Sequence, residues 1–153
     1  MARTRDQVRA ERPTDGDYRT LLEFRTRLRR FLRWSEHAAK EAGLHPSMHQ
    51  LLLAIRGCGI EGGPRITEIA EYLVVRHHTA VEIIDRAERA GLVRRAIDPI
   101  DSRAVRVQLT DEGQERLAAL TRQHLDELQQ FLPVLSRLDQ GLPDSDGPLV
   151  DRP

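Results

Sequence analysis

The stretch from Ile66 to Leu109 limits the possible folds of this chain more than any other, because its pattern changes there from helical to alternating. Its first part has apolar residues at steps of three and four: Ile66, Ile69, Ala70 and Leu73. This spacing places them on one face of a short helix, for which Thr67 is the predicted N-cap. A second helix is predicted from about Arg76 to Ala90, since Gly91 is a usual residue just beyond a helix end.

The second helix has one apolar face and one polar face. The apolar positions, spaced to pack on the first helix, are Ala80, Ile83, Ile84 and Ala87. The residues left outward are Arg76, His77, His78, Thr79, Val81, Glu82, Asp85 and Arg86. We therefore expect this helix to present a polar face that starts at its N-terminal end.

Two strands are predicted after these helices. Leu92–Arg95 reads as one strand, and Val105–Leu109 alternates apolar and polar residues as a half-buried strand does. The loop between them, Ala96–Ala104, is too long for a two-residue hairpin and suits a protruding wing. Thr110 is the predicted N-cap of the following helix. This order is that of a winged helix-turn-helix, a mainly α fold with a small β-wing that places its second helix in the DNA major groove.

Amphipathic helices are predicted on both sides of this lobe. The first, about Asp17–Ala42, ends at Gly43, and Pro46 opens a further helix that runs through Arg56. The first helix carries an apolar stripe of Leu21, Phe24, Leu28, Phe31, Leu32 and Ala39, and a basic ridge of Arg25, Arg29 and Arg33. The last helical region runs from Asp111 to about Gln140, and Pro133 is expected to break or kink it.

The two long helices with apolar stripes at the ends of this small domain predict that the chain forms a dimer. A single domain of this size has little need of such helices unless they pack against a partner. The predicted dimer interface consists of Leu21, Leu28, Phe31, Leu117, Leu120, Leu128, Phe131 and Leu135.

Composition divides the chain into three parts. Residues 1–16 are rich in arginine and are expected to form a mobile arm, and residues 141–153 are expected to form a disordered tail. Between them we expect one domain, 17–140, with the winged lobe at about 44–110 and dimerisation helices at about 17–42 and 111–140.

The stretch 65–110 has eight basic and seven acidic residues. Two copies, and local clustering of arginines on the wing, are expected to compensate for this weak positive charge.

The single cysteine excludes an intrachain disulfide framework and fits a reducing compartment. No apolar run approaches membrane-spanning length, and the N-terminus lacks a signal-peptide core. We therefore expect a cytoplasmic protein without a membrane partner.

The chain resembles the MarR family of bacterial transcription regulators from about Tyr18 to Leu138. The resemblance rests on three segments in order: Gly91-Leu92-Val93-Arg94-Arg95, Asp101-Ser102-Arg103, and Leu109-Thr110-Asp111-Glu112-Gly113. It implies a homodimer that binds a pseudo-palindromic site in double-stranded DNA and responds to a small aromatic ligand. In the family the arginine of the wing motif reaches the minor groove or the backbone, which implies this role for Arg103, with Asp101 holding it.

Base contacts are expected at the start of the second helix. Arg76, His77 or His78 can donate to guanine, and Thr79 and Val81 can touch a thymine methyl group. Glu82 suits a cytosine amine or, in the simpler interpretation, an ion pair with Arg86. Arg86, Arg94, Arg95 and Arg106 complete the predicted DNA-binding set. The family often has Ser at the position of Arg76, and Glu82 is a departure from its pattern.

The resemblance also implies candidate effector-binding residues between the dimerisation helices and the lobe: Arg25, Arg29, Trp34, His37 and His124. The simpler interpretation of Arg25 and Arg29 is a solvated face, and that of His124 is a hydrogen-bonded interface histidine. No arrangement typical of an enzyme stands out, and no cofactor is expected.

Other functions remain open. A winged helix that lacks DNA binding and serves as a protein-interaction module is the main alternative, because of Glu82 and the weak charge of the lobe. Gly57–Gly62 matches a dinucleotide pattern, with Leu51–Ile55 as a candidate strand, but the following helix is delayed by Pro64 and Thr67. Cys58 allows a redox sensor, although a passive, exposed thiol is simpler. A metal sensor would use His45 with His49 or His77 with His78, yet neither pair has further ligands at recognisable spacing, so no metal is expected.

Overall fold

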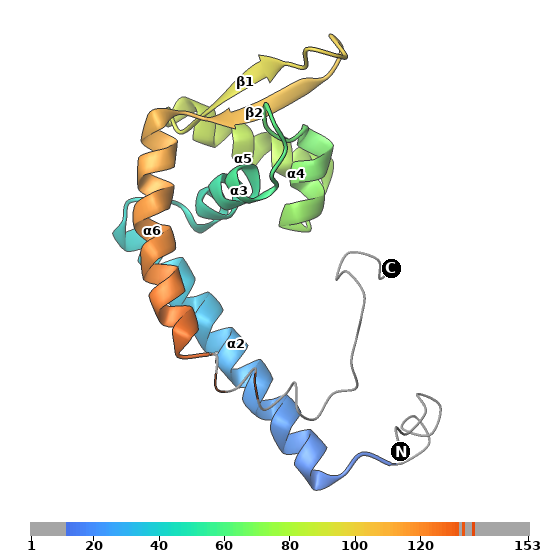
Figure 1. The fold of residues 1–153 in the computed structure, drawn as a ribbon, viewed down its shortest axis with the longest axis vertical. Helices are drawn as coiled ribbons and strands as arrows, with labels where there is room; N and C mark the ends of the chain where they lie inside the picture. The colour runs from blue at the N-terminus through green and yellow to red at the C-terminus, as the bar shows by residue number, and fades with distance from the viewer. Residues whose placement is uncertain (1–11, 132, 134–135, 137–153) are drawn as a thin grey trace. The chain divides into compact units, whose positions relative to one another are not determined.

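A computed structural model describes residues 12–131, 133 and 136 of the chain. Its elements are, in order, α2 (Asp15–Glu41), α3 (Pro46–Gly57), α4 (Ile66–Leu73), α5 (His77–Arg89), β1 (Val93–Ile97), β2 (Val105–Leu109) and α6 (Asp111–Gln129) (Figure 1). This confirms the predicted mainly α fold with a two-stranded wing. The chain divides into two compact units, one of 33–125 and one of 1–32 with 126–153. The division falls inside α2 and α6, whereas the sequence suggested boundaries at the helix ends.

The helix-turn-helix consists of α4 and α5. The predicted N-cap of α4 is wrong: Arg65 holds that position, and its backbone N–H donates to Glu68 Oε2 at 2.7 Å, so Thr67 lies inside the helix. At the other end Val74 has a φ of 53°, and the N–H groups of Val74 and Val75 donate to the carbonyls of Glu71 and Ala70. This left-handed residue turns the chain sharply into α5.

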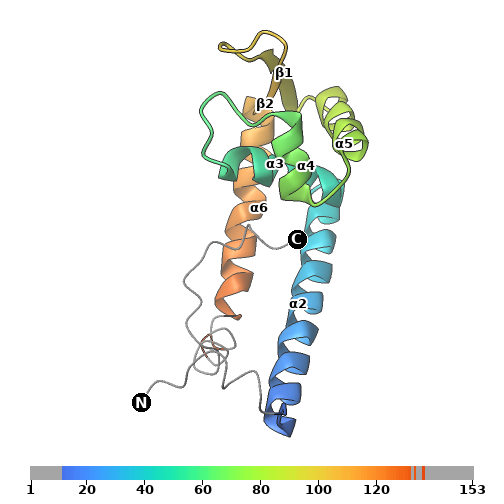
Figure 2. The same ribbon diagram turned by 90° about the vertical axis from the view of Figure 1, so that its right-hand side faces the viewer.

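The wing is an antiparallel hairpin in which Val93 pairs with Leu109 and Ile97 with Val105. The first strand starts one residue later and ends two residues later than predicted, so the wing loop is shorter, 98–104. Figure 2 shows this loop extending past α3, α4 and α5. We use the word wing below for β1, this loop and β2.

Thr110 and Gly113 join the wing to α6. The predicted N-cap is confirmed, because Thr110 Oγ1 accepts from the Gly113 N–H at 3.1 Å and donates to the Gly91 carbonyl at 2.6 Å. A Cβ atom at Gly113 would lie 2.1 Å from the Leu92 carbonyl oxygen. Glycine is therefore required where α6 starts against the chain that enters β1.

One apolar core supports the unit of 33–125. Its fully buried side chains include Leu51, Leu52, Ile69, Ile84 and Val107. The predicted inner face of α5 is confirmed, since Ala80, Ile83, Ile84 and Ala87 are all buried. Leu117 and Leu120, predicted for a dimer interface, are buried in this core, so that assignment is wrong for both.

The unit of 1–32 with 126–153 exposes apolar side chains. Phe31 and Phe131 contact each other edge to face, with ring centroids 5.4 Å apart. The exposed residues are Tyr18, Leu21, Leu22, Leu28, Leu32 and Leu128. Helix α6 ends at Gln129, ahead of Pro133. Leu135, residues 1–11 of the predicted arm and the predicted tail at 141–153 lie outside the described residues.

Within the described part of the chain, no helix combines the length and the apolar character needed to cross a lipid bilayer.

Candidate nucleic-acid interface

The outward face of α5 starts at its N-terminal turn. Arg76 is the N-cap residue and His77 and His78 form the first turn, which contains no acidic residue. Arg76, His77, His78, Glu82 and Arg86 are exposed, whereas Thr79 and Val81 are half-buried. The N-terminal end of a helix carries partial positive charge, so this end of α5 suits an anionic partner.

Glu82 is exposed on the same face. The simpler interpretation of Glu82, an ion pair with Arg86, is not borne out: within the described residues, neither side chain makes an ion pair. The carboxylate is thus available for a contact outside the chain.

Local clustering of arginines was expected on the wing, but its four arginines divide into two kinds. Arg94 and Arg103 are exposed. Arg95 instead bonds to Asp85 and Glu88 of α5. Burial disfavours its charged form, but these two carboxylates outweigh the burial and raise the pKa of Arg95. Arg95 therefore ties the wing to α5.

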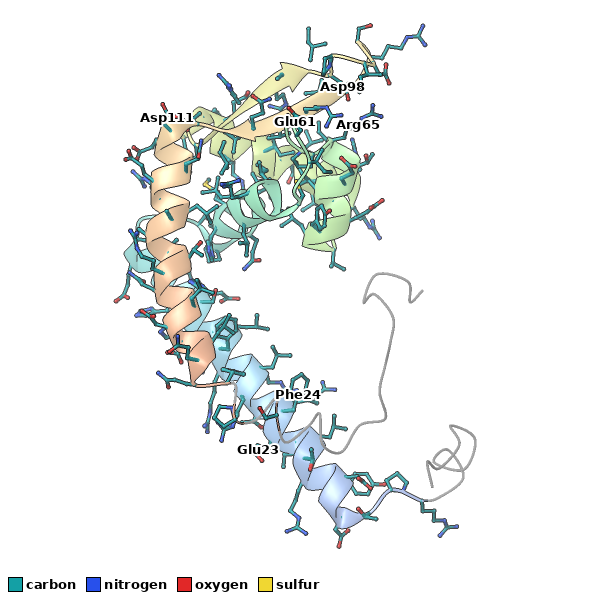
Figure 3. The ribbon with its side chains drawn as sticks, viewed as in Figure 1. Glu23, Phe24, Glu61, Arg65, Asp98 and Asp111 are labelled. Atoms are coloured by element: carbon teal, nitrogen blue, oxygen red, sulfur yellow. The ribbon has the colours of Figure 1, made fainter. Side chains whose placement is uncertain are left out.

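Arg106 is directed into the protein, towards Asp98. The Asp98 side chain is fully buried and accepts hydrogen bonds from four groups: the N–H of Ile100 at 2.9 Å, the N–H of Asp101 at 3.2 Å, Arg106 Nε at 2.9 Å and Arg65 Nη2 at 3.0 Å. Figure 3 shows Asp98 and Arg65 close together beneath the wing loop. The Ile100 N–H is the main cause that holds the pKa of Asp98 down at about 2, against the opposing effect of burial.

The loop before α4 is fastened to the second strand. The Val107 N–H donates to the Pro64 carbonyl at 2.9 Å, and Arg106 Nη1 donates to the Gly63 carbonyl at 2.7 Å. A Cβ atom at Gly63, where φ is 90°, would lie 2.0 Å from the Val107 carbonyl oxygen. Asp98, Arg65 and this loop therefore hold the wing and α4 as one body.

The contacts of Asp101 differ from the expectation that it holds Arg103. Asp101 does not hold the Arg103 side chain: its Oδ1 accepts from the Arg103 backbone N–H at 3.1 Å, and its Oδ2 lies 3.9 Å from Arg65 Nη2.

The dinucleotide alternative is contradicted, because the proposed strand Leu51–Ile55 lies within helix α3. Sequence reasoning missed Asp98 and Arg65, because their burial and pairing arise only when the wing meets the start of α4.

The effector candidates are divided between the two compact units. Trp34 and His124 contact each other with ring centroids 4.8 Å apart, and His49 lies 4.6 Å from His124. His37 pairs instead with Glu41 on the surface of α2. Arg25 and Arg29 are exposed in the other compact unit.

The hydrogen bonds of His124 define its tautomer. Its Nδ1 lies 2.8 Å from the Leu120 carbonyl, which can only accept, so Nδ1 carries the proton. In the neutral ring Nε2 then accepts from the Ser35 hydroxyl at 2.7 Å. His49 beside it is buried, and burial, with a smaller effect of His124, lowers the pKa of His49 to about 4. His49 is thus a neutral core residue at pH 7.

The described residues offer little support for redox or metal sensing. Cys58 is half-buried rather than exposed, and its thiol donates to the Ile55 carbonyl at 3.3 Å. His45 Nδ1 caps α3 by accepting from the Ser47 N–H at 3.2 Å. No group of three or more His, Cys, Asp and Glu side chains within the described ranges is placed to hold a metal ion.

An open hollow of about 560 Å³ lies between α3, β2 and α6. Leu109, Leu117 and Ala118 supply apolar lining, and Arg56 and Arg122 supply two cations. Within the described residues neither arginine forms an ion pair. Glu115 adds one carboxylate to the same lining. The two arginines outnumber it, so the hollow suits an anion with an apolar body.

Comparison with known proteins agrees with this geometry. Residues 51–105 match the MarR family profile. This region of the chain is similar to the MarR family. The match runs from within α3 to the first residue of β2, and so includes the helix-turn-helix and the wing loop.

Individual relatives are similar over a longer part of the chain than residues 51–105. The helix-turn-helix-type transcriptional regulator YkoM of Bacillus subtilis (strain 168) is 31% identical over 102 residues, 65% of this chain and 64% of YkoM. The chain thus spans less than two thirds of that relative. AbsC, a MarR family transcriptional regulator from Streptomyces coelicolor, has the same fold, with a TM-score of 0.69 and 22% identity over 87% of this chain and 93% of AbsC. The transcriptional repressor CouR, solved with a 23-mer DNA duplex, gives a TM-score of 0.62 and 26% identity over 85% of this chain and 98% of CouR.

Proposed function

We propose that this chain is a DNA-binding transcription regulator. The observation that carries the proposal is the exposed N-terminal face of α5 beside a wing that presents Arg103 and is held to α4 through Asp98. A helix-turn-helix uses this end of its second helix to contact base edges. The likeness to CouR, which is bound to a DNA duplex, supports the same use here.

We further propose that the working form is a homodimer that binds a pseudo-palindromic site. The exposed apolar residues Leu21, Leu28 and Leu32 of α2 and Leu128 of α6 support this, since a partner would cover them. Two copies would also double the number of exposed arginines that face the DNA phosphates.

The test is the affinity for duplexes that the wild-type protein selects from a randomised pool, measured by fluorescence anisotropy at several salt concentrations. Arg103→Ala should cost about 1–3 kcal/mol and should reduce the salt dependence by about one released counterion. Arg116→Ala, which changes an exposed arginine on α6, is the matched control. Absence of any salt-dependent DNA binding would leave the protein-interaction module as the better function.

A response to a small molecule is a second, finer proposal. The hollow lined by Arg56, Leu117 and Arg122 supports an aromatic carboxylate ligand better than the predicted set around Trp34 does, because the Trp34 ring already packs on His124. Benzoate should raise the melting temperature of the wild type, and Arg122→Gln should abolish the shift. Benzyl alcohol, with the same ring and no charge, is the control ligand. An equal shift with both ligands, or an unchanged shift in the variant, would reject this site.

A further inference from the structure

The tip of the wing is apolar as well as basic. Ile100 is 90% exposed and Ile97 is 73% exposed, although each is a large aliphatic side chain. Pro99 between them is also exposed. A single exposed apolar residue needs no explanation, but these residues gather within one short stretch that also leads to the exposed Arg103.

The loop that carries the apolar tip is held in place by hydrogen bonds. The Ile100 N–H donates to Asp98 Oδ1 at 2.9 Å, while Asp98 Oδ2 accepts from Arg65 and Arg106. The Asp98 N–H donates to the Ala104 carbonyl at 3.0 Å, which closes the base of the loop. The Ile100 backbone cannot fold back onto the protein without breaking its N–H bond to a buried carboxylate, so the loop keeps this residue at an exposed position.

A preformed apolar tip beside a cation fits the DNA minor groove. The walls of that groove are sugar edges, its floor carries acceptors at A·T pairs, and proteins that enter it use isoleucine, leucine and proline as well as arginine. Arg94 and Arg103, which form no ion pair within the described residues, give the wing the charge that a DNA partner requires. A rigid loop also loses little conformational entropy on binding.

We propose that Ile100, with a smaller contribution from Ile97, packs between the sugar walls of the minor groove and reads the width of the groove beside each half-site. This inference rests on the proposed function, because it requires that the chain bind DNA. Arg103 supplies the charged contact and Ile100 the apolar contact. Ile100 therefore favours A·T pairs at positions where no side chain reaches a base edge in the major groove.

The two contacts have different signatures. Removal of an apolar contact releases no counterion, so Ile100→Ala should weaken binding about tenfold without changing the slope of log affinity against log salt. Arg103→Ala should weaken binding and lower that slope by about 1. The control is Leu53→Ala, an exposed leucine on α3. Melting temperatures of all variants establish that they fold.

The base pairs beneath the wing provide the second arm of the experiment. Footprinting of the selected duplex locates these pairs, and each A·T pair is then replaced by G·C or by inosine·cytosine. Guanine adds an amino group to the minor groove, whereas inosine·cytosine lacks it. Wild-type affinity should fall with G·C and recover with inosine·cytosine, and Ile100→Ala should lose most of this preference.

The inference fails if Ile100→Ala binds like the wild type, if it lowers the salt slope as Arg103→Ala does, or if it keeps the full preference against G·C. A wild-type protein that binds no duplex instead rejects the proposed function itself. A wild-type protein that binds DNA while Ile100→Ala is unaffected rejects only the role of the wing tip, and makes Ile100 a candidate contact for another protein.

Discussion

His49 should make the stability of this protein fall below neutral pH. Its side chain is 2% exposed on the inner face of α3, beside the ring of His124. Burial lowers its pKa to about 4, against about 6.5 for a histidine in an unfolded chain. The unfolded state therefore binds a proton over a pH range in which the folded state does not.

The sign and size of the effect follow from these two values. A lowered histidine pKa means that the contribution to stability is complete above pH 6.5 and is lost as the pH falls towards 4. At about 1.4 kcal/mol per pKa unit, the loss relative to pH 8 is about 2 kcal/mol at pH 5 and about 3 kcal/mol at pH 4. A domain of ordinary stability has about 5–15 kcal/mol in total, so the change is readily measured.

The assay is urea denaturation of wild type and His49→Gln between pH 8 and pH 4. The quantity of interest is the difference in unfolding free energy between the two proteins, because the carboxylates that titrate in the same range are common to both. That difference should shrink by about 2 kcal/mol between pH 8 and pH 5. His37→Gln controls for the loss of a histidine at an exposed position. Parallel curves for wild type and His49→Gln would refute the reasoning, since His49 would then titrate alike in both states.

Two backbone positions give further predictions. Val74→Gly should raise the melting temperature by about 1–4 °C in a thermal scan, because a left-handed β-branched residue costs about 1–2 kcal/mol. Glycine loses more backbone entropy on folding, which offsets only part of this gain. Little packing is lost, since the Val74 side chain is 90% exposed. An unchanged or lower melting temperature would mean that Val74 is not strained. Gly113→Ala should destabilise the fold by about 1–3 kcal/mol in urea, because its Cβ would lie 2.1 Å from the Leu92 carbonyl oxygen. Gly57→Ala is the matched control, as a Cβ there meets nothing within 4 Å, and equal effects of the two changes would contradict this explanation.

Periodicity predicted the elements of this fold well, because each amphipathic element here follows its own spacing. The inner face of α5 was correct at all four positions, including Ile83 and Ile84. The errors lie where an element meets another. Thr67 has the residue type of an N-cap, but the bridge between Arg65 and Arg106 fixes the start of α4 earlier. Leu117 and Leu120 were assigned to a dimer, because a helical stripe does not show whether its own chain or a second copy covers it.

The candidate site was less predictable than the fold. The sequence shows that Arg94, Arg95, Arg103 and Arg106 belong to one wing, but residue type alone does not distinguish an arginine that faces solvent from one that holds a buried carboxylate. Asp98 was seen only as part of a loop. Its role depends on Arg65, which is 33 positions away in sequence and reaches it through tertiary structure. The roles of the outward residues in DNA binding remain predictions.

The weak charge of the winged lobe takes on a different meaning once exposure is considered. Its acidic residues are mostly engaged within the fold: Glu68, Asp85, Glu88, Asp98 and Asp101 are all buried or half-buried and bonded to groups of the same lobe. The exposed charges of 65–110 are Glu71 and Glu82 against Arg76, Arg86, Arg89, Arg94 and Arg103. Charges more than about 8–10 Å apart are screened at physiological salt, so a DNA backbone close to the surface responds to this exposed set rather than to the total. A nearly neutral lobe can therefore present a basic surface, and the acids that neutralise its total charge are also the groups that hold the wing in place.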